Sequence, residues 1–190
     1  APNFGGLVLD QTRESNAWSE ELRLTSPSDG PLRWLIGAYF LKTHRNVESS
    51  AFLDLTGSGD FSAVRLSFLP ERNRNNAYAV FGTLDYDLSD AFKLSFGLRQ
   101  DWDDRTQINP ASGSRIANTF KSLQPKVSAS YFFESDKMVY ASAARGFRSG
   151  GFNAESNIFP RQYDSETANT YELGSKLTLV NGKVQLNMAA

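Results

Sequence analysis

Residues 92–104 read FKLSFGLRQDWDD. Their even-numbered positions from 92 to 102 carry Phe92, Leu94, Phe96, Leu98 and Trp102, interrupted only by Gln100, whereas the odd-numbered positions carry lysine, serine, glycine, arginine and aspartate. Because successive side chains of a β-strand point to opposite faces, this alternation predicts a strand with one apolar face and one charged face.

The same period of two recurs along the chain, in SLQPKVSASYFF at 122–133 and in TYELGSKLTL at 170–179. Helical periodicity is hard to find, so the sequence predicts an all-β protein. The expected strands are 17–26, 32–42, 77–87, 92–104, 121–133, 138–148, 168–179 and 184–190.

Short and long connections alternate between these strands. Tight turns are expected at SDGP (28–31), LSD (88–90), ESDK (134–137) and NG (181–182), and Asn-Gly is a strong hairpin signal because both residues tolerate positive φ. Long polar stretches at 43–76, 109–118 and 151–167 are expected to be loops. All tight turns would then lie at one end of an antiparallel meander and all long loops at the other.

This layout, with strands that reach about 9–11 residues, is typical of an up-and-down transmembrane β-barrel. Aromatic residues support it, because Tyr86, Phe92, Tyr131 and Phe133 lie near short turns while Tyr78 and Trp102 lie near the opposite ends. A soluble carbohydrate-binding β-sandwich remains an alternative, since its core would need the same rings.

The alternation assigns the two faces of the predicted barrel wall. The residues expected to face lipid are Leu94, Phe96, Leu98, Val127, Ala129, Tyr131, Leu173 and Leu177. Those expected to face the lumen are Lys93, Arg99, Asp101, Asp103, Lys126, Glu172 and Lys176, a stripe of mixed sign that either satisfies itself or steers a ligand.

Composition excludes several other classes of protein. With 20 basic against 21 acidic residues among 190, no positive field exists to hold nucleic acid. The absence of cysteine and the single His44 argue against disulfides, metal sites and catalytic triads. We therefore expect no enzyme activity, no metal and no cofactor. Asp101 and Asp103 share a face about 7 Å apart, but nothing else supports acid–base catalysis.

The glycine-rich segment Gly146–Gly151 ends a strand and lacks the lysine of a phosphate-binding loop. We expect it to bend or bulge the strand where a loop begins. Arg145 falls in phase with apolar neighbours, which predicts a bulge or a side chain that reaches lipid headgroups. Pro125 lacks a ladder donor, so we expect it near the outer end of its strand.

The segments GFRSGGFN (146–153) and YELGSK (171–176) carry a resemblance to a known family. Together with SEELRLTSPSDGPLRWLIGAYF (19–40), YAVFGTLDYDLSDAFKLSFGLRQDWDD (78–104) and FKSLQPKVSASYFFESDKMVYASAAR (120–145), they resemble the barrel domain of TonB-dependent outer-membrane receptors. The resemblance covers nearly the whole chain apart from its first residues and parts of the loops.

The resemblance implies a barrel of about 22 strands in the outer membrane of a Gram-negative bacterium, plugged by an N-terminal domain. Such receptors import scarce ligands, by default ferric siderophores and otherwise cobalamin, haem or carbohydrates, with energy supplied through TonB. Residues 1–190 would be a partial barrel domain without the plug and the C-terminal strands. The alternative is a complete small barrel of eight strands with a structural or adhesive role.

Ligand contacts in this family-based reading would come from the long loops. The weak candidates in 43–76 and 151–167 are Arg65, Phe152, Phe159 and Arg161, joined by Phe52 and Phe61, because aromatic and arginine side chains can hold a planar or anionic chelate.

Overall fold

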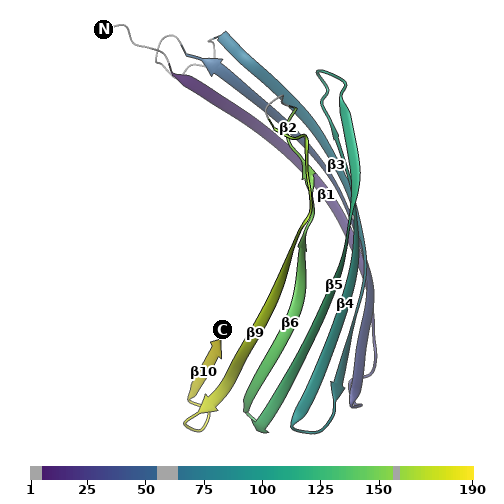
Figure 1. The fold of residues 1–190 in the computed structure, drawn as a ribbon, viewed down its shortest axis with the longest axis vertical. Helices are drawn as coiled ribbons and strands as arrows, with labels where there is room; N and C mark the ends of the chain where they lie inside the picture. Colours follow the sequence, from purple (N-terminus) through teal and green to yellow (C-terminus); the bar gives the residue numbers. More distant parts are fainter. Residues whose placement is uncertain (1–5, 55–63, 156–158) are drawn as a thin grey trace, which may run out of the picture.

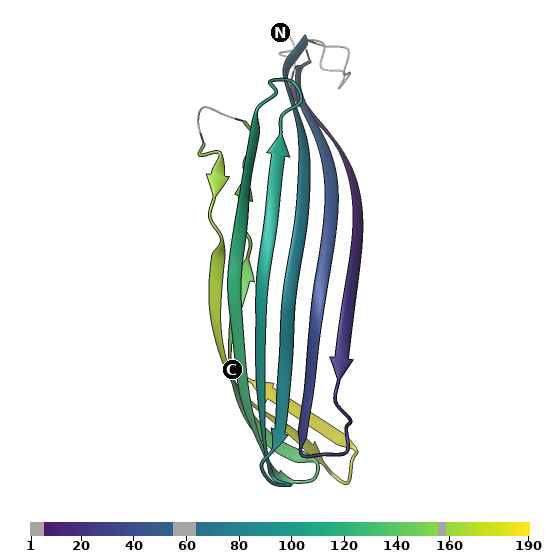
Figure 2. The same cartoon turned by 90° about the vertical axis from the view of Figure 1, so that its right-hand side faces the viewer.

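The computed structural model describes residues 6–54, 64–155 and 159–190. Eight strands form one antiparallel sheet in the order β1-β2-β3-β4-β5-β6-β9-β10 (Figures 1 and 2). Their bounds are β1 Leu7–Thr25, β2 Leu32–Leu53, β3 Val64–Asp87, β4 Phe92–Ile108, β5 Arg115–Glu134, β6 Lys137–Arg148, β9 Glu166–Leu179 and β10 Val184–Ala189. The all-β antiparallel prediction is confirmed, and no helix of the described residues is long and apolar enough to cross a membrane.

The tight turns gather at one end of the sheet. Residues 26–31, 88–91, 135–136 and 180–183 connect strands at this turn end, as the sequence predicted. In the last turn, Val180, Asn181 and Gly182 all adopt positive φ, of 53°, 50° and 85°, which explains the Asn-Gly pair there. β2, β4 and β6 end, and β3, β5 and β9 begin, at the opposite end of the sheet, which we call the loop end.

The strands reach much further toward the loop end than expected. Residues 43–76 were predicted to be a loop, but β2 and β3 stay paired through Lys42↔Asn76 and His44↔Arg74 up to Leu53↔Val64. β1 likewise begins at Leu7 rather than at 17, and the loop predicted at 109–118 is only 109–114. Most of these extensions, such as 43–50 and 71–76, carry polar residues on both faces and so show no apolar alternation. The backbone ladder still forms there, because it needs no particular side chain.

A second, very small sheet sits at the loop end. β7 (Gly151–Phe152) pairs with β8 (Gln162–Tyr163) within the predicted loop 151–167. Gly150 and Gly151 are needed for close approach, because a Cβ at Gly150 would lie 2.3 Å from the Phe120 ring and one at Gly151 would lie 2.4 Å from the Tyr163 hydroxyl. Both glycines have ordinary φ, so close contact rather than a bend explains this motif.

The structure removes one of the two alternatives for Arg145 and contradicts the predicted position of Pro125. The β6–β9 register runs without a shift through Arg145↔Asn169, so no bulge lies at Arg145, and the alternative that this side chain reaches lipid headgroups stays a prediction. Pro125 lies in the middle of β5 rather than at its outer end. It is tolerated there because the β5–β6 ladder begins only at Lys126↔Ala144, just beyond the proline.

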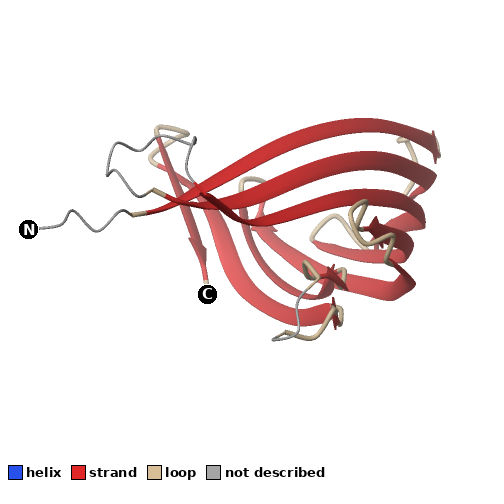
Figure 3. Ribbon diagram, turned by 90° about the horizontal axis from the view of Figure 1, so that it is seen from above, coloured by secondary structure: helices blue, strands red, loops and turns tan. Residues whose placement is uncertain are grey.

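Seen from above, the sheet curves into an open trough (Figure 3). β1 pairs only with β2 and β10 only with β9 among the described residues, so these eight strands do not close on one another. The alternative of a complete eight-stranded barrel is therefore not what this chain forms.

Candidate functional site

The pairing register sorts the predicted face residues as expected. Lys93, Arg99, Asp101, Asp103, Lys126, Glu172 and Lys176 share one face, and Leu94, Phe96, Leu98, Val127, Ala129, Tyr131, Leu173 and Leu177 share the other. We call these the polar face and the apolar face. Whether they meet lumen and lipid stays a prediction at this point.

The polar face is the concave one, since its side chains converge across intervening strands. The Arg99 guanidinium of β4 lies 5.5 Å from the Phe81 ring of β3 and 5.6 Å from the Tyr39 ring of β2, and Arg23 of β1 approaches the same Phe81 ring at 6.0 Å. Gly37 makes room for that ring, because a Cβ there would lie 2.5 Å from it. A concave surface brings side chains of non-adjacent strands together in this way.

Most charges of the polar face are already paired. Arg99 binds Asp101 at 2.8 Å, and Gln124 donates to the same carboxylate at 2.5 Å. Arg33 makes a two-bonded pair with Asp87 at 2.7 and 2.8 Å, and the Tyr140 hydroxyl donates to Glu172 at 2.6 Å. The predicted stripe of mixed sign therefore mainly satisfies itself, and a ligand site must be sought elsewhere on this face.

Such a site lies nearer the loop end, where a pocket of about 260 Å³ opens on the concave face. We call it the basic pocket. Its lining comes from β1–β4 and from the small β7–β8 sheet: Ser15, Thr43, Arg45, Asn73, Arg74, Asn75, Arg105, Thr106, Gly151, Phe152 and Tyr163. By alternation Arg74 and Thr106 point to the opposite face and contribute backbone.

Two guanidinium groups, those of Arg45 and Arg105, give the basic pocket its positive charge. Arg105 uses its Nε to bind Asp103 at 2.8 Å, and its terminal nitrogens have no partner among the described residues. Arg45 is exposed and makes no ion pair with any described residue. The Asn73 Nδ2 and Asn75 Oδ1 atoms are buried and equally lack partners there. The guanidinium nitrogens and the Asn73 Nδ2 can donate hydrogen bonds to an anionic ligand, whereas the Asn75 Oδ1 is an acceptor and would need a donor group.

The segment that contains β7 and β8, which contributes to the pocket lining, is hydrogen-bonded to the β4–β5 connection. Glu155 accepts hydrogen bonds from Asn109 Nδ2 and from the Ser112 hydroxyl, both at 2.7 Å, and Arg161 donates to Ser114 Oγ at 2.6 Å. Arg161 also contacts Glu155 at 3.3 Å. The Ser112 hydroxyl, with help from Asn109 and Arg161 and against partial burial, holds the pKa of Glu155 below its ordinary value. We call these residues the loop cluster.

The four predicted loop candidates fall in different places. Phe152 lines the basic pocket and packs against Phe120, with ring centroids 6.5 Å apart. Arg161 belongs to the loop cluster, and Phe159 lies 66% exposed at the loop end. Arg65 lies on β3, not in a loop, with its guanidinium 4.9 Å from the Phe68 ring. Phe61 lies outside the described residues.

Arg45, Asn73, Arg105 and Tyr163 were missed by the sequence analysis. Arg45 and Asn73 were hidden inside the segment expected to be a loop. Continuing the predicted alternation forward from 32–42 would have placed Arg45 on the polar face, and continuing it backward from 77–87 would have placed Asn73 there. Nothing in the sequence indicated that Tyr163 folds back over β4.

The apolar face has a different character. It carries two bands of aromatic side chains, Trp18, Phe40, Tyr78 and Trp102 nearer the loop end and Trp34, Tyr86, Phe92, Tyr131 and Phe133 nearer the turn end. On β4 the bands are ten residues apart, about 34 Å along the strand. A strand tilt of about 40° reduces this to about 26 Å, close to the height of the apolar band of an outer-membrane barrel.

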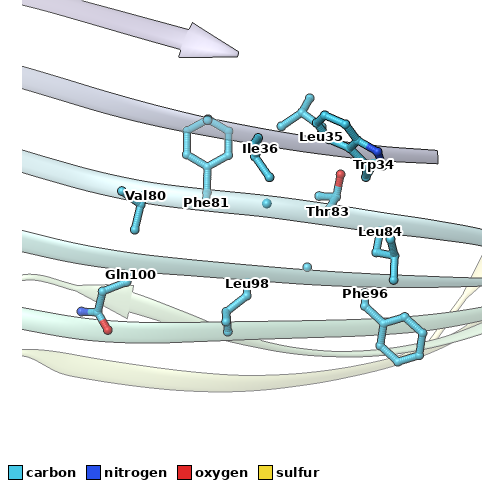
Figure 4. A pocket seen from close by; sticks show the side chains of 13 residues that line it. Trp34, Leu35, Ile36, Val80, Phe81, Thr83, Leu84, Phe96, Leu98 and Gln100 are labelled. Carbon is cyan, nitrogen blue, oxygen red and sulfur yellow. The ribbon is translucent and has the colours of Figure 1, made fainter. Parts of the chain in front are cut away.

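An open hollow of about 620 Å³ lies between the two bands (Figure 4). Its lining includes Gly82 together with Trp34, Ile36, Val80, Leu84, Phe96 and Leu98. Because its surface is almost wholly apolar and open, it offers no group that would hold a polar ligand in a defined orientation.

Comparison with known proteins decides the family. Residues 2–190 match the family model described as "TonB dependent receptor-like, beta-barrel". The chain belongs to this family. TonB-dependent receptors are outer-membrane transporters of Gram-negative bacteria and not enzymes, so the predicted location and the absence of enzyme activity are confirmed.

Solved structures with the same fold include several receptors for iron complexes. The ferric yersiniabactin uptake receptor FyuA of Yersinia pestis is 20% identical, with a TM-score of 0.77 over 97% of this chain and 29% of FyuA. The siderophore receptor PiuA of Acinetobacter baumannii is 16% identical, with a TM-score of 0.70 over 94% of this chain and 31% of PiuA.

The ferripyoverdine receptor of the Pseudomonas aeruginosa outer membrane, solved with ferripyoverdine bound, is 18% identical, with a TM-score of 0.68 over 95% of this chain and 25% of the receptor. At these identities the likeness concerns the fold. The chain spans less than a third of the length of each of these proteins.

Proposed function

We propose that this chain forms part of the wall of a receptor that imports an anionic metal chelate, a ferric siderophore by default, across the outer membrane with energy supplied through TonB. The observation that carries the proposal is the basic pocket on the concave face of a sheet that belongs to this family.

The apolar face would contact lipid and the polar face would line the lumen. The distance between the two aromatic bands and the exposure of the apolar residues between them support this orientation. With the tight turns in the periplasm, as is usual for such barrels, the basic pocket lies toward the extracellular side.

The eight strands would be one sector of a barrel of about 22 strands. The unpaired outer edges of β1 and β10, and the coverage of less than a third of the solved receptors, support a partial barrel domain. A plug domain in the full-length protein would then fill the lumen beside the polar face and carry the contact with TonB.

Ligand capture would be non-covalent. The Arg45 and Arg105 guanidiniums can each donate two parallel hydrogen bonds to a carboxylate or to another anionic chelating group. The Phe152 ring and the Tyr163 phenol offer flat surfaces beside them. Arg45 has no ion-pair partner among the described residues, and Arg105 is paired with Asp103 only through its Nε, so the pocket favours an anionic chelate over cobalamin or a neutral carbohydrate. The names of FyuA and the ferripyoverdine receptor support an iron complex.

The test uses the full-length receptor in a strain that lacks it. Uptake of radioactive iron would be measured with a panel of ferric siderophores, with and without a protonophore that collapses the proton gradient. We expect at least one siderophore to be imported only when the receptor and the gradient are both present. No uptake of any siderophore, combined with uptake of cobalamin or of a carbohydrate, would overturn the assigned ligand class.

Purified receptor then tests the pocket. Arg45→Gln should weaken binding of the transported chelate by roughly 10- to 100-fold, because a charge-assisted hydrogen bond contributes roughly 1.5–3 kcal/mol. Arg105→Lys keeps the charge beside Asp103 but loses the fork geometry, so a smaller loss is expected. Arg115→Gln, an exposed arginine on the opposite face near the same end, is the matched control. Equal affinities for all four proteins would remove the basic pocket from the mechanism.

A further inference from the structure

The polar face of β4 carries two arginine–aspartate pairs that differ in how much of the guanidinium they use. In the pair nearer the turn end, Asp101 accepts hydrogen bonds from both Nε and Nη2 of Arg99, at 2.9 and 2.8 Å. In the pair nearer the loop end, Asp103 accepts a hydrogen bond only from Nε of Arg105, at 2.8 Å. The first aspartate therefore occupies one whole side of its arginine, whereas the second leaves both terminal nitrogens of Arg105 available.

The available nitrogens of Arg105 are directed toward the basic pocket. A Cβ added at Gly151 would lie 3.3 Å from Arg105 Nη1 and 2.4 Å from the Tyr163 hydroxyl, so the guanidinium and the phenol meet beside this glycine. All three residues line the pocket, and no hydrogen bond joins Nη1, Nη2 or this hydroxyl to another described residue. The two groups can therefore donate together to an anionic group that has two oxygen atoms, such as a carboxylate.

Asp103 lies behind the pocket rather than in its lining. It is only 6% exposed, and Ala77 and Phe120 stand opposite it on the neighbouring strands. Phe120 is equally buried, and Gly150 lies against its ring. Because water is largely kept from the Asp103 carboxylate, its hydrogen bond to Arg105 is stronger than the same bond in an exposed pair.

This bond fixes the orientation of the guanidinium before a ligand arrives. Among the residues that the structure describes, Arg105 Nε is the only donor to the Asp103 carboxylate, whose Oδ1 atom is buried without a partner. An unrestrained arginine loses much rotational freedom when it binds a ligand, and the loss is smaller if one hydrogen bond already holds the side chain.

We propose that Asp103 is a positioning residue, which holds Arg105 so that Nη1 and Nη2 face the pocket and bind two oxygen atoms of an anionic group on the chelate. The inference rests on the proposed function and names the residue that prepares the same pocket for its ligand. The negative charge of Asp103 would itself repel an anionic chelate. Positioning and simple charge therefore predict opposite effects when this carboxylate is removed.

The test measures binding to the purified full-length receptor by quenching of tryptophan fluorescence, with ferric dicitrate and with each ferric siderophore of the uptake panel as probes. Asp103→Asn removes the charge and keeps the size of the side chain, and Asp103→Ser is a second variant with no amide to place beside Phe120. Both should weaken binding by about tenfold, the effect of one lost hydrogen bond of ordinary strength. Asp101→Asn is the matched control and should not weaken binding, because its partner Arg99 lies outside the pocket.

A double-mutant cycle separates positioning from a general loss of structure. Arg105→Gln removes the group that Asp103 holds, so adding Asp103→Asn to it should change the affinity by less than about twofold. A purely structural role would instead lower the affinity by the same factor in both backgrounds. Migration on gels before and after boiling shows which variants keep a folded barrel, and failure of both Asp103 variants to fold would assign the residue to stability and overturn the proposal.

Unchanged or tighter binding by Asp103→Asn and Asp103→Ser would also overturn the proposal, since the removal of a negative charge alone predicts that result. Iron uptake separates the positioning role from the proposed function. A receptor that imports a chelate and is unaffected by the Asp103 substitutions removes only the positioning role. A receptor that neither binds nor imports any chelate of the panel removes the proposed ligand class, and the positioning role with it.

Discussion

The two halves of the sheet differ in how polar and apolar side chains are distributed, although the same strands run through both. Toward the turn end, β4 alternates Phe92, Leu94, Phe96 and Leu98 with polar residues. Toward the loop end, the same strand carries polar residues on both faces, and its hydrogen-bonded register with β3 and β5 continues unchanged to Ile108.

The difference separates what the backbone needs from what the surroundings need. A β-ladder satisfies its own N–H and C=O groups in either half. Only where one face meets hydrocarbon must that face be apolar, because an exposed polar group there loses its hydrogen bonds to water. On the orientation proposed above, alternation marks the part of each strand that would lie in the membrane and not the whole strand.

The largest expected difference between the two halves is in how well each tolerates a charge on its apolar face. Leu98→Lys lies midway between the two aromatic bands and should lower the free energy of unfolding of the full-length receptor by about 2–4 kcal/mol. Ala117→Lys lies on the same face near the loop end, where the side chain meets water, and should cost less than about 0.5 kcal/mol. Urea unfolding in lipid vesicles measures both, and equal losses would contradict the membrane position of the bands.

An intermediate loss of stability is expected when a side chain is added to the closely packed concave face. Gly37→Ala would place a Cβ 2.5 Å from the Phe81 ring and 2.9 Å from the Leu22 carbonyl oxygen, so it should cost about 1–3 kcal/mol. Gly97→Ala is the control, because its nearest new neighbour would be the Lys126 Cβ at an ordinary 3.5 Å. Thermal unfolding of both variants is the measurement, and a neutral Gly37→Ala would show that the ring moves aside freely.

The smallest expected effect concerns the loop cluster and pH. Since the Ser112 hydroxyl and its neighbours lower the pKa of Glu155 in the folded protein, the carboxylate stabilises the cluster above its ordinary pKa of 4.5. This contribution should be lost as the pH falls through the lower folded-state value. Hydrogen exchange at the amides of Ala111 and Gly113, which both bond to Asn109, should stay constant from pH 8 to 5 and accelerate below 4.5 after correction for intrinsic exchange.

Glu155→Gln provides the control for that experiment. Its amide cannot titrate, so the acceleration below pH 4.5 should disappear at both amides. An unchanged pH dependence in this variant would assign the effect to another group.

The sequence alone determined the all-β class, the order of eight strands, the four tight turns and the sorting of residues between two faces. Each of these depends on local chemistry: a period of two, a hairpin signal such as Asn181-Gly182, or the apolar side chains that one face requires. The pattern of Leu94, Phe96 and Leu98 against Lys93 and Arg99 needed no tertiary information.

Only the tertiary structure decided how far the strands extend, why Gly150 and Gly151 are glycines, and which residues form the basic pocket. Arg45, Arg105 and Tyr163 come from segments far apart in the chain and meet because the sheet curves and the β7–β8 segment folds back onto it. Such encounters depend on curvature and on contacts between distant segments, and a local sequence pattern carries no record of either.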